Sequence, residues 1–360
     1  MSFYWNIFGP LNLGLDLAMV ASFFLLVRIN RGLQSGKGWW AILRQAALGA
    51  IFLWTMAGLY VGGIVGLALI ARCFWTLFTV ALPLLLAFFA VRRARYLLFA
   101  PALLLVGFKY YGEVLEPGLV EVERAVITVE GLKAPLKVAH ISDLQTDGLR
   151  PMHQAVLSAV NGYSPDFIFF TGDILNHAAI QPQIKEYLGG FKSRRGSFFV
   201  GGNVDGLLNL PEFFAGTGFT LLDDSYRRVR HEAGAVGIVG LGLDSFADRP
   251  LLKKLLSAMG KADVTLLLSH VPDAYPNAAE LGVDAVFSGH THGGQVCLPW
   301  FGPVLTMSGV PRKIAAGGIH LVKETYVIVS RGLGLEGHVA PRVRLFCRPN
   351  LLLLEIRPKK

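Results

Sequence analysis

The sequence predicts an N-terminal α-helical segment with several membrane spans, followed by an α/β domain of two packed β-sheets flanked by helices. Three observations predict this division. The 360 residues are 53% hydrophobic and only 16% charged, against about 25% charged in an average soluble chain. Apolar runs long enough to cross a bilayer occur only before residue 113. Beyond residue 119, short apolar runs bounded by turn-forming residues replace them.

The net charge belongs to the apolar part of the chain. Residues 1–111 hold nine bases and one acid, a balance of +8 out of +9 for the whole chain, so the rest carries only +1. Bases beside apolar runs set membrane topology, whereas a nucleic-acid-binding domain carries its bases on its own surface. We therefore expect a lipid bilayer, and no nucleic acid, among the partners.

Four apolar runs are the expected spans of a membrane anchor at residues 1–112. A helix needs about 20 apolar residues to cross the bilayer core. The runs are Phe8–Val27, Ala46–Ala71, Phe74–Val91 and a weaker run at Tyr96–Phe108. The first contains Asp16, which we expect near a helix end or facing neighbouring helices, with no catalytic role. Apolar runs this far along the chain do not fit a cleavable signal peptide.

The basic residues predict the orientation of this anchor. Four bases lie between the first two runs, at positions 28–44, and three follow the third run, at positions 92–95. A short connection near Arg72 carries one more. The positive-inside rule places the first and third loops in the cytoplasm. With four spans, the domain that follows lies on the extracytoplasmic side.

The rest of the chain is predicted to be a β-rich α/β domain. Residues 113–135 form a connector with a first strand at Val120–Val129, where apolar and polar residues alternate. Residues 136–360 form the main domain, with buried strands expected at Lys137–Ile141, Asp166–Phe170, Ser197–Val200, Val236–Leu241, Val264–Leu268, Val283–Phe287, Thr325–Val329 and Leu351–Ile356. Helices are expected at His153–Asn161, Gln183–Phe191, Leu251–Met259 and Asp273–Leu281. Two packed sheets with helices outside accommodate this many strands.

Metal-binding side chains follow five of the expected strands. In chain order they are Asp143, Asp173, Asn203 with Asp205, His270, and His290 with His292. Functional sites of α/β sheets gather at the carboxyl ends of strands. Each residue alone is typical of a turn, a helix cap or a structural histidine. The five groups together, in this order, predict a metal site.

These motifs resemble those of the calcineurin-like metallophosphoesterases over residues 120–360. The segments Ser-Gly-His-Thr-His-Gly-Gly-Gln at 288–295, Val-Ser-Arg-Gly-Leu-Gly at 329–334 and Arg-Leu-Phe-Cys-Arg-Pro at 344–349 are similar to the membrane-anchored bacterial branch. That branch is similar to enzymes that split the pyrophosphate of UDP-diacylglucosamine or remove phosphate groups near the membrane. The resemblance implies a metallophosphoesterase domain with a ββ sandwich, in a multi-pass protein of the bacterial inner membrane.

The resemblance also implies two divalent metal ions. One would be held by Asp143, Gln145, Asp173 and His292, and the other by Asp173, Asn203, His270 and His290, with Asp173 as the bridge. Mixed oxygen and nitrogen ligands suit Mn, Fe or Zn. Gln145 replaces the usual histidine, which moves the preference towards Mn or Mg, and we expect manganese. A hydroxide held by both ions would attack phosphorus.

A second departure from the family concerns protonation of the leaving group. Val204 stands where the family usually has a histidine, whose help as a general acid is typically worth about 10²–10⁴-fold. Either the leaving group is already good, as in a pyrophosphate, or another residue substitutes. Asp205 is the nearest candidate, and His177 and Asp147 are others. We therefore expect Asn203 and Asp205 to take part in catalysis.

Two classes of function fit these residues. The first is a membrane-tethered, dinuclear-metal phosphohydrolase that cleaves a phosphoester or pyrophosphate bond of a phosphorylated small molecule or lipid. The alternative, favoured by Gln145 and Val204, is a metal-dependent phosphate- or nucleotide-binding membrane sensor with little or no turnover. A small transporter or channel is disfavoured because the anchor lacks several intramembrane polar residues. The sequence leaves the substrate, the metals and the oligomeric state open.

Overall fold

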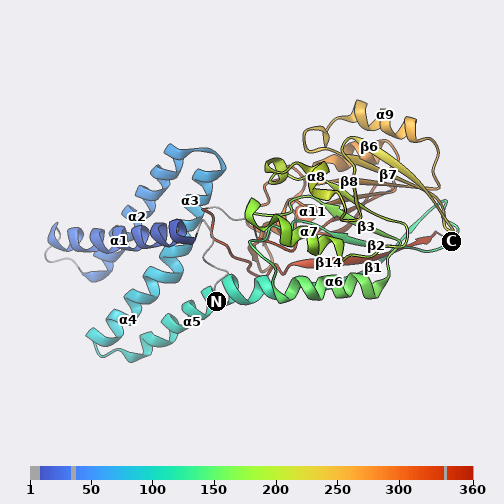
Figure 1. The fold of residues 1–360 in the computed structure, drawn as a ribbon. Coiled ribbons are helices and arrows are strands. Elements are labelled where there is room, and N and C mark those ends of the chain that lie inside the picture. The colour runs from blue at the N-terminus through green and yellow to red at the C-terminus, as the bar shows by residue number, and fades with distance from the viewer. Residues whose placement is uncertain (1–8, 34–37, 336–338, 360) are drawn as a thin grey trace. The chain divides into compact units, whose positions relative to one another are not determined.

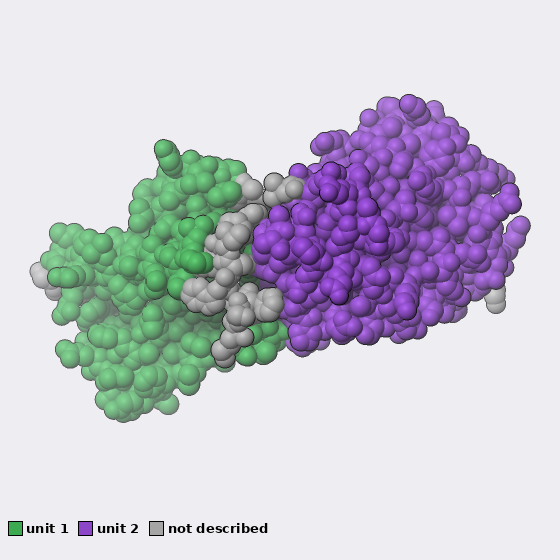
Figure 2. Space-filling view, viewed as in Figure 1, with its two compact units in different colours: residues 1–115, 336–342 green, residues 116–335, 343–360 purple. Residues whose placement is uncertain are grey.

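The chain divides into two units, which Figure 2 shows in different colours. The computed structural model describes residues 9–33, 38–335 and 339–359. Unit 1 comprises residues 1–115 and 336–342, and unit 2 comprises residues 116–335 and 343–360. Of the described residues, the short segment at 339–342 therefore clusters with the N-terminal part of the chain, although it lies near the C-terminus in sequence.

Unit 1 consists of apolar helices (Figure 1). They are α1 Gly9–Leu33, α2 Trp39–Val61, α3 Gly63–Thr76, α4 Leu82–Arg92 and α5 Phe99–Tyr110. A π-helical turn at Leu77–Ala81 joins α3 to α4. Among the described residues, four stretches are long and apolar enough to cross a membrane: Pro10–Leu33, Trp39–Val61, Val65–Arg92 and Tyr96–Gly118. The prediction of a multi-span α-helical segment is confirmed.

The boundary between the second and third spans differs from the prediction. The run Ala46–Ala71 is interrupted at Gly62 and Gly63, whose φ angles are 71° and 56°. Glycine adopts positive φ at no steric cost, so two adjacent glycines allow the chain to reverse there. Arg72 consequently lies inside α3, and the predicted connection near Arg72 is wrong. The turn between α2 and α3, at Gly62 and Gly63, carries no basic residue.

Arg72 forms an ion pair with Asp16 inside unit 1. Its Nη2 and Nε lie 2.8 Å and 2.9 Å from the two carboxylate oxygens of Asp16, and Thr76 Oγ1 donates to the same carboxylate at 2.7 Å. Arg72 Nη1 also donates to the carbonyl oxygens of Val339 and Ala340. Charges inside membrane helices are costly unless they are paired. The pairing explains how two charged residues are retained in otherwise apolar helices.

Unit 2 is built on two six-stranded sheets, in the orders β1-β14-β2-β3-β4-β5 and β12-β13-β9-β8-β7-β6. The first sheet comprises β1 Glu121–Val129, β2 Leu136–Ile141, β3 Phe167–Thr171, β4 Gly196–Val200, β5 Phe219–Leu221 and β14 Asn350–Pro358. The second comprises β6 Ser225–His231, β7 Gly234–Leu241, β8 Val264–Ser269, β9 Ala285–Ser288, β12 Gly318–Val322 and β13 Thr325–Val329. A short hairpin pairs β10 Cys297–Leu298 with β11 Gly302–Pro303.

The two sheets pack face to face, and helices cover their outer faces (Figure 1). Alternate residues of one strand serve the two sides, because successive side chains of a strand point in opposite directions. Phe167 and Phe169 enter the core between the sheets, whereas Ile168 and Phe170 pack towards the helices. The covering helices are α6 Pro151–Tyr163, α7 Gln181–Gly189 and α8 Leu210–Phe214 on the first sheet, and α9 Arg249–Met259 and α10 Tyr275–Glu280 on the second. The predicted architecture of unit 2 is confirmed.

Three strands of the two large sheets were not predicted, and all are edge strands. β5 and β6 each end a sheet, as does β12. An edge strand buries fewer side chains and is often charged, so it lacks a continuous apolar run. The seven residues of β6, Ser-Tyr-Arg-Arg-Val-Arg-His, show this directly, since their three arginines are exposed and no continuous apolar run is present.

Candidate metal centre

The predicted ligands converge at one end of the two sheets. Strands β2, β3 and β4 run parallel in the first sheet, as do β7, β8 and β9 in the second. The carboxyl ends of parallel strands meet at the same edge, where sites of α/β folds lie. The segments that follow these strands carry all the carboxylates, amides and imidazoles predicted as ligands.

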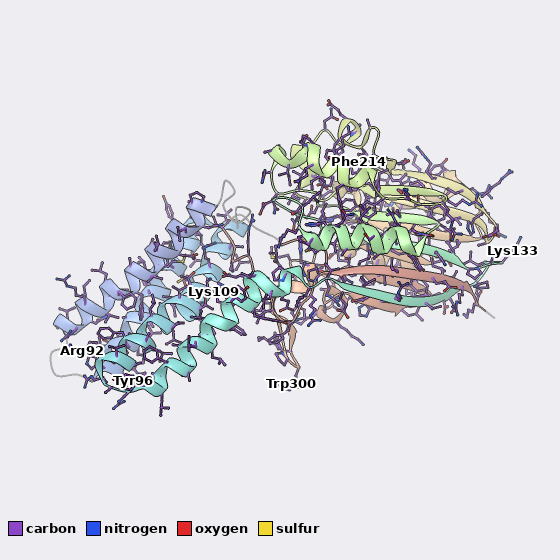
Figure 3. The ribbon with its side chains drawn as sticks, turned by 60° about the horizontal axis from the view of Figure 1, so that its bottom comes forward. Arg92, Tyr96, Lys109, Lys133, Phe214 and Trp300 are labelled. Atoms are coloured by element: carbon purple, nitrogen blue, oxygen red, sulfur yellow. The ribbon has the colours of Figure 1, made fainter. Side chains whose placement is uncertain are left out.

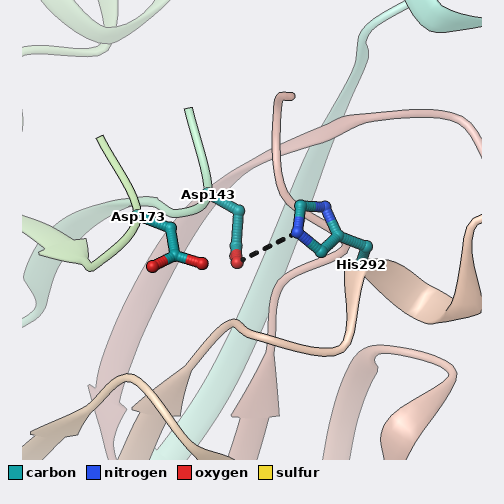
Figure 4. A group of neighbouring side chains, drawn as sticks. All are labelled: Asp143, Asp173 and His292. Carbon is teal, nitrogen blue, oxygen red and sulfur yellow. Dashed lines mark ion pairs between the residues drawn. The ribbon is translucent and has the colours of Figure 1, made fainter. Parts of the chain in front are cut away.

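Asp143, Asp173 and His292 form the buried part of the group (Figure 4). One potential ligand atom from each lies within 4.8 Å of the others. His292 Nε2 is 3.5 Å from Asp143 Oδ1. Two carboxylates in a buried position need positive charge nearby, because burial without compensation is costly. A divalent cation between these side chains would supply that charge.

Asn203, His270 and His290 form a second part of the group beside Asp173. Asn203 Oδ1 lies 3.0 Å from His270 Nε2 and 2.9 Å from His290 Nδ1. His270 Nε2 is also 3.4 Å from Asp173 Oδ2. Asn203 is exposed and His290 is half-buried, so this part faces solvent, where a substrate can reach it.

The hydrogen bonds of the His270 and His290 rings indicate that a cation fits between these rings and Asn203, which we call the second position. His270 Nδ1 lies 2.8 Å from the carbonyl oxygen of Thr171, and His290 Nε2 lies 3.2 Å from that of Met307. A carbonyl only accepts, so each of these nitrogens carries the proton in the neutral ring. When both rings are neutral, the opposite nitrogens present lone pairs to the amide oxygen of Asn203. Three acceptors around one point require a cation or a proton.

Gln145 and His292 indicate that a cation also fits the first position, which lies beside Asp143 and Asp173. Gln145 Nε2 donates to Asp173 Oδ2 at 3.1 Å. Among the described residues, buried Gln145 Oε1 and His292 Nδ1 have no hydrogen-bond partner. Rotation of the Gln145 amide would exchange its two ends and turn Oε1 towards Asp173, the orientation that a shared cation favours. The donor set therefore fits hard or borderline divalent metals.

The carboxylates and imidazoles perturb one another strongly. Burial lowers the pKa of His270, but the carboxylates of Asp173 and Asp143 outweigh it and raise that pKa to about 10. Burial raises the pKa of Asp143 to about 7, and the positive charge of His270 cancels only part of this rise. For Asp173, burial also acts to raise the pKa, but His270 and the neighbouring hydrogen bonds hold it below its ordinary value. A metal ion and these protons compete for the same lone pairs.

The backbone is strained at most of the predicted ligands. Five of the seven have positive φ: Asp143 at 47°, Gln145 at 20°, Asp173 at 60°, His290 at 67° and His292 at 48°. Such conformations cost residues other than glycine about 1–3 kcal/mol each and cluster at functional sites. Gly289 is required for a different reason. A Cβ there would overlap Ser142 Oγ and Asp143 Oδ2, so only glycine allows the two sheets' loops to approach.

Asp205 supports the loop that carries Asp173. Its buried carboxylate accepts the backbone N–H groups of Asp173, Ile174 and Gly202, each at 2.8 Å. Burial, with the nearby charge of Asp173, raises the pKa of Asp205 to about 6. The N–H of Val204 donates to Asp173 Oδ1 at 2.9 Å, which places residue 204 beside the same carboxylate. His177 and Asp147 are not among the side chains that the group brings together.

Arg344 was given no role by the sequence, yet it joins the loops around His292. It is fully buried. Its guanidinium donates to the carbonyl oxygens of Gly334 at 2.6 Å and Arg331 at 2.8 Å, and Nη1 lies 3.5 Å from that of His292. The motif at 344–349 begins with Arg344 and was the only signal in the sequence for this role. The fold alone shows that its guanidinium donates hydrogen bonds to the loops around residues 331–334 and 347. Arg331, in contrast, pairs with Glu121 and Glu123.

Comparisons with known proteins agree with this geometry. A profile described as calcineurin-like phosphoesterase matches residues 136–294. The uncharacterized metallophosphoesterase YkuE of Bacillus subtilis (strain 168) is 30% identical over 245 residues, 62% of this chain and 82% of that protein. The UDP-2,3-diacylglucosamine pyrophosphatase LpxG of Chlamydia muridarum (strain MoPn / Nigg) is 24% identical over 306 residues, 67% of this chain and 90% of that protein. LpxG of Chlamydia trachomatis serovar D is 26% identical over 289 residues, 61% of this chain and 85% of that protein.

Proposed function

The chain belongs to the calcineurin-like phosphoesterase family, and on this premise we propose that it is a membrane-tethered enzyme that uses two metal ions to cleave a lipid-linked substrate. Membership makes the chain a hydrolase of phosphoester bonds that uses divalent metals. The proposal adds the number of ions, their ligands and the kind of substrate. The observation that carries it is the meeting of three potential acceptors, Asn203 Oδ1, His270 Nε2 and His290 Nδ1. They lie beside the carboxylates of Asp143 and Asp173.

We assign the ligands to two positions that share Asp173. The first ion would be bound by Asp143, Gln145, Asp173 and His292, and the second by Asp173, Asn203, His270 and His290. Asp173 Oδ2 lies 3.1 Å from Gln145 Nε2 and 3.4 Å from His270 Nε2, which supports a bridging carboxylate. An amide oxygen in the first position favours manganese, with iron, zinc and magnesium as the alternatives.

The chain's own residues orient the site. The chemistry that two bound ions would supply is activation of a water molecule and polarisation of the phosphoryl group. The bond from His270 Nδ1 to Thr171 fixes the ring so that Nε2 stays available, and Asp205 fixes the loop of Asp173. Val204 has no proton to give to a leaving group. A leaving group of low pKa, such as the nucleotide phosphate released from a pyrophosphate, is therefore favoured.

Two further observations support a lipid-linked pyrophosphate as the substrate. The part of the chain that the structure describes has four helices long and apolar enough to cross a membrane, and these would tether the site to a bilayer. The LpxG relatives are named for the cleavage of UDP-2,3-diacylglucosamine, a pyrophosphate that carries acyl chains. Both the tether and the missing general acid thus favour the same class of substrate. An extracytoplasmic site on a bacterial inner membrane is the orientation that the basic loops support.

The test is metal analysis of the purified full-length protein, combined with hydrolysis assays in added Mn²⁺. The substrates are a UDP-lipid pyrophosphate, an aryl phosphodiester and an alkyl phosphomonoester. We expect about two ions per chain in the wild type and fastest turnover of the pyrophosphate. Asp173→Asn should lose both ions and turnover. Asp248→Asn, which alters a carboxylate that caps α9 through Leu251 N, should keep both.

Two outcomes would contradict the proposal. Two bound ions and full activity in Asp173→Asn would show that the assignment of ligands is wrong. Metal binding by the wild type without hydrolysis of any substrate would instead support the alternative of a phosphate-binding membrane sensor.

A further inference from the structure

A hairpin next to the metal centre exposes a cluster of large apolar side chains. It runs from Cys297 to Met307 and includes β10 and β11. Trp300, between the two strands, is fully exposed, and Figure 3 shows it at the outer end of the hairpin. Four more side chains of the hairpin are 48–54% exposed: Leu298, Phe301, Val304 and Leu305. We call these five residues the apolar tip.

The hairpin is held at both of its ends, so the tip is presented outwards by the fold. Before the first strand, Val296 bridges to Leu345, and Cys297 N donates to Leu345 O at 2.8 Å. After the second strand, Ser308 Oγ donates to Asp273 at 2.6 Å. Trp300 itself has a φ of 64°, which is unfavourable for a bulky residue. A strained and exposed tryptophan on an anchored hairpin indicates a contact with something outside unit 2.

The hairpin is directly connected to the proposed second metal position. The carbonyl oxygen of Met307, at the end of the hairpin, accepts the bond from His290 Nε2 at 3.2 Å. One end of the hairpin therefore contacts a solvent-facing ligand, and the apolar tip lies on the same hairpin. Whatever surface the tip contacts is brought close to the open side of the metal centre.

The charges around the tip complement an anionic lipid surface. Residues 297–313, which comprise the hairpin and the basic residues that follow it, contain no acidic residue and include Arg312 and Lys313. The guanidinium of Arg312, in the short helix α11 Arg312–Ala315, lies 4.1 Å from the centre of the Phe301 ring. Tryptophan prefers the interface between headgroups and acyl chains, and basic side chains beside it interact with lipid phosphates.

We propose that the apolar tip inserts into the interfacial layer of the bilayer that the chain's own helices span. The bilayer is the occupant that the observations favour, because the same chain is tethered to it and because apolar, aromatic and basic residues lie together at the tip. The contact would let the metal centre receive a lipid-linked phosphate without removing it from the membrane. This use of the contact rests on the proposed function, whereas the contact itself does not.

The contact can be measured without any turnover. The full-length chain, labelled with fluorotryptophan, is placed in nanodiscs of phosphatidylethanolamine and phosphatidylglycerol and observed by fluorine NMR. The Trp300 resonance is assigned by its loss in Trp300→Phe. A spin label on the lipid acyl chain near the headgroup should broaden this resonance strongly, and a water-soluble relaxation agent should leave most of its intensity. Leu321→Trp provides the control, because Leu321 is 59% exposed on β12 of the same unit. Its new resonance should respond to the water-soluble agent alone.

Three results would overturn the inference. Trp300 could respond only to the water-soluble agent, which would place the tip in solvent. It could respond to neither agent, which would show that a protein or a second copy of the chain covers it. Equal broadening of Leu321→Trp by the lipid label would show that unit 2 has no preferred face. A Trp300 in the lipid interface together with absent hydrolysis would refute the proposed function and leave this inference standing.

Discussion

Replacement of Asp205 by asparagine distinguishes a residue that positions Asp173 from one that donates a proton. Asp205 uses one oxygen for the N–H groups of Asp173 and Gly202 and the other for that of Ile174. An asparagine has one carbonyl oxygen. Whichever way its amide turns, at least one buried N–H faces an NH₂ group and loses its acceptor.

The size of the effect follows from these bonds. A buried donor left without a partner costs about 1–3 kcal/mol, and each 1.4 kcal/mol is about tenfold in an equilibrium constant. We expect this cost to fall on the conformation that presents Asp173, so metal affinity should drop about 5- to 150-fold. Because burial raises the pKa of Asp205 to about 6, a neutral side chain also relieves an unfavourable charge. The free energy of unfolding should therefore change less than the metal affinity.

The assay is a Mn²⁺ titration followed by turnover of an aryl phosphodiester and an alkyl phosphomonoester at saturating Mn²⁺. A positioning role predicts weaker Mn²⁺ binding and similar losses on both substrates. Asp284→Asn is the matched control, because Asp284 accepts Thr265 N at 2.7 Å at the opposite ends of β8 and β9. It should lower stability without changing metal affinity. Unchanged Mn²⁺ affinity, with a loss confined to the alkyl ester, would refute the positioning role and identify Asp205 as a proton donor.

Three further predictions concern the general acid, pH and orientation. Val204→His should raise turnover of alkyl esters more than of aryl esters, by well under about 10²–10⁴-fold because the new ring lacks a pre-built partner; equal gains on both would contradict a role in protonation. Burial lowers the pKa of His153 from 6.5 to about 4, so protonation favours the unfolded chain and stability is lost as pH falls from 6.5 towards 4. Between pH 7 and 5 the wild type should therefore lose on the order of 2 kcal/mol more unfolding free energy than His153→Gln. The thermal midpoint of the solubilised wild type should accordingly fall more than that of the variant, and equal falls would exclude this residue as the cause. Protease added to intact spheroplasts should digest the chain beyond residue 115, whereas full protection until lysis would place unit 2 in the cytoplasm.

The sequence predicted the buried strands of unit 2 well, because a buried strand is a local signal. β3, β8 and β9 each appear as a short run of Val, Ile, Leu and Phe that ends at a polar residue. The three missed edge strands lack this signal, since most of their residues are only partly buried or exposed. The glycine turn at Gly62 and Gly63 was missed for a related reason. An apolar run shows that a segment lies in the membrane but does not show where the helix reverses.

The sequence by itself determined the two-part organisation, the family and the identity and order of the predicted ligands, because these depend on residue type and on periodicity along the chain. Only the tertiary structure decided what each polar group faces. It paired Asp16 with Arg72, turned Asp205 towards three backbone amides and held Trp300 away from the core. Such contacts join residues that are distant in sequence, and their energies depend on distances and angles of a few tenths of an ångström. That geometry is created by packing of the whole fold, so no local pattern in the sequence carries it.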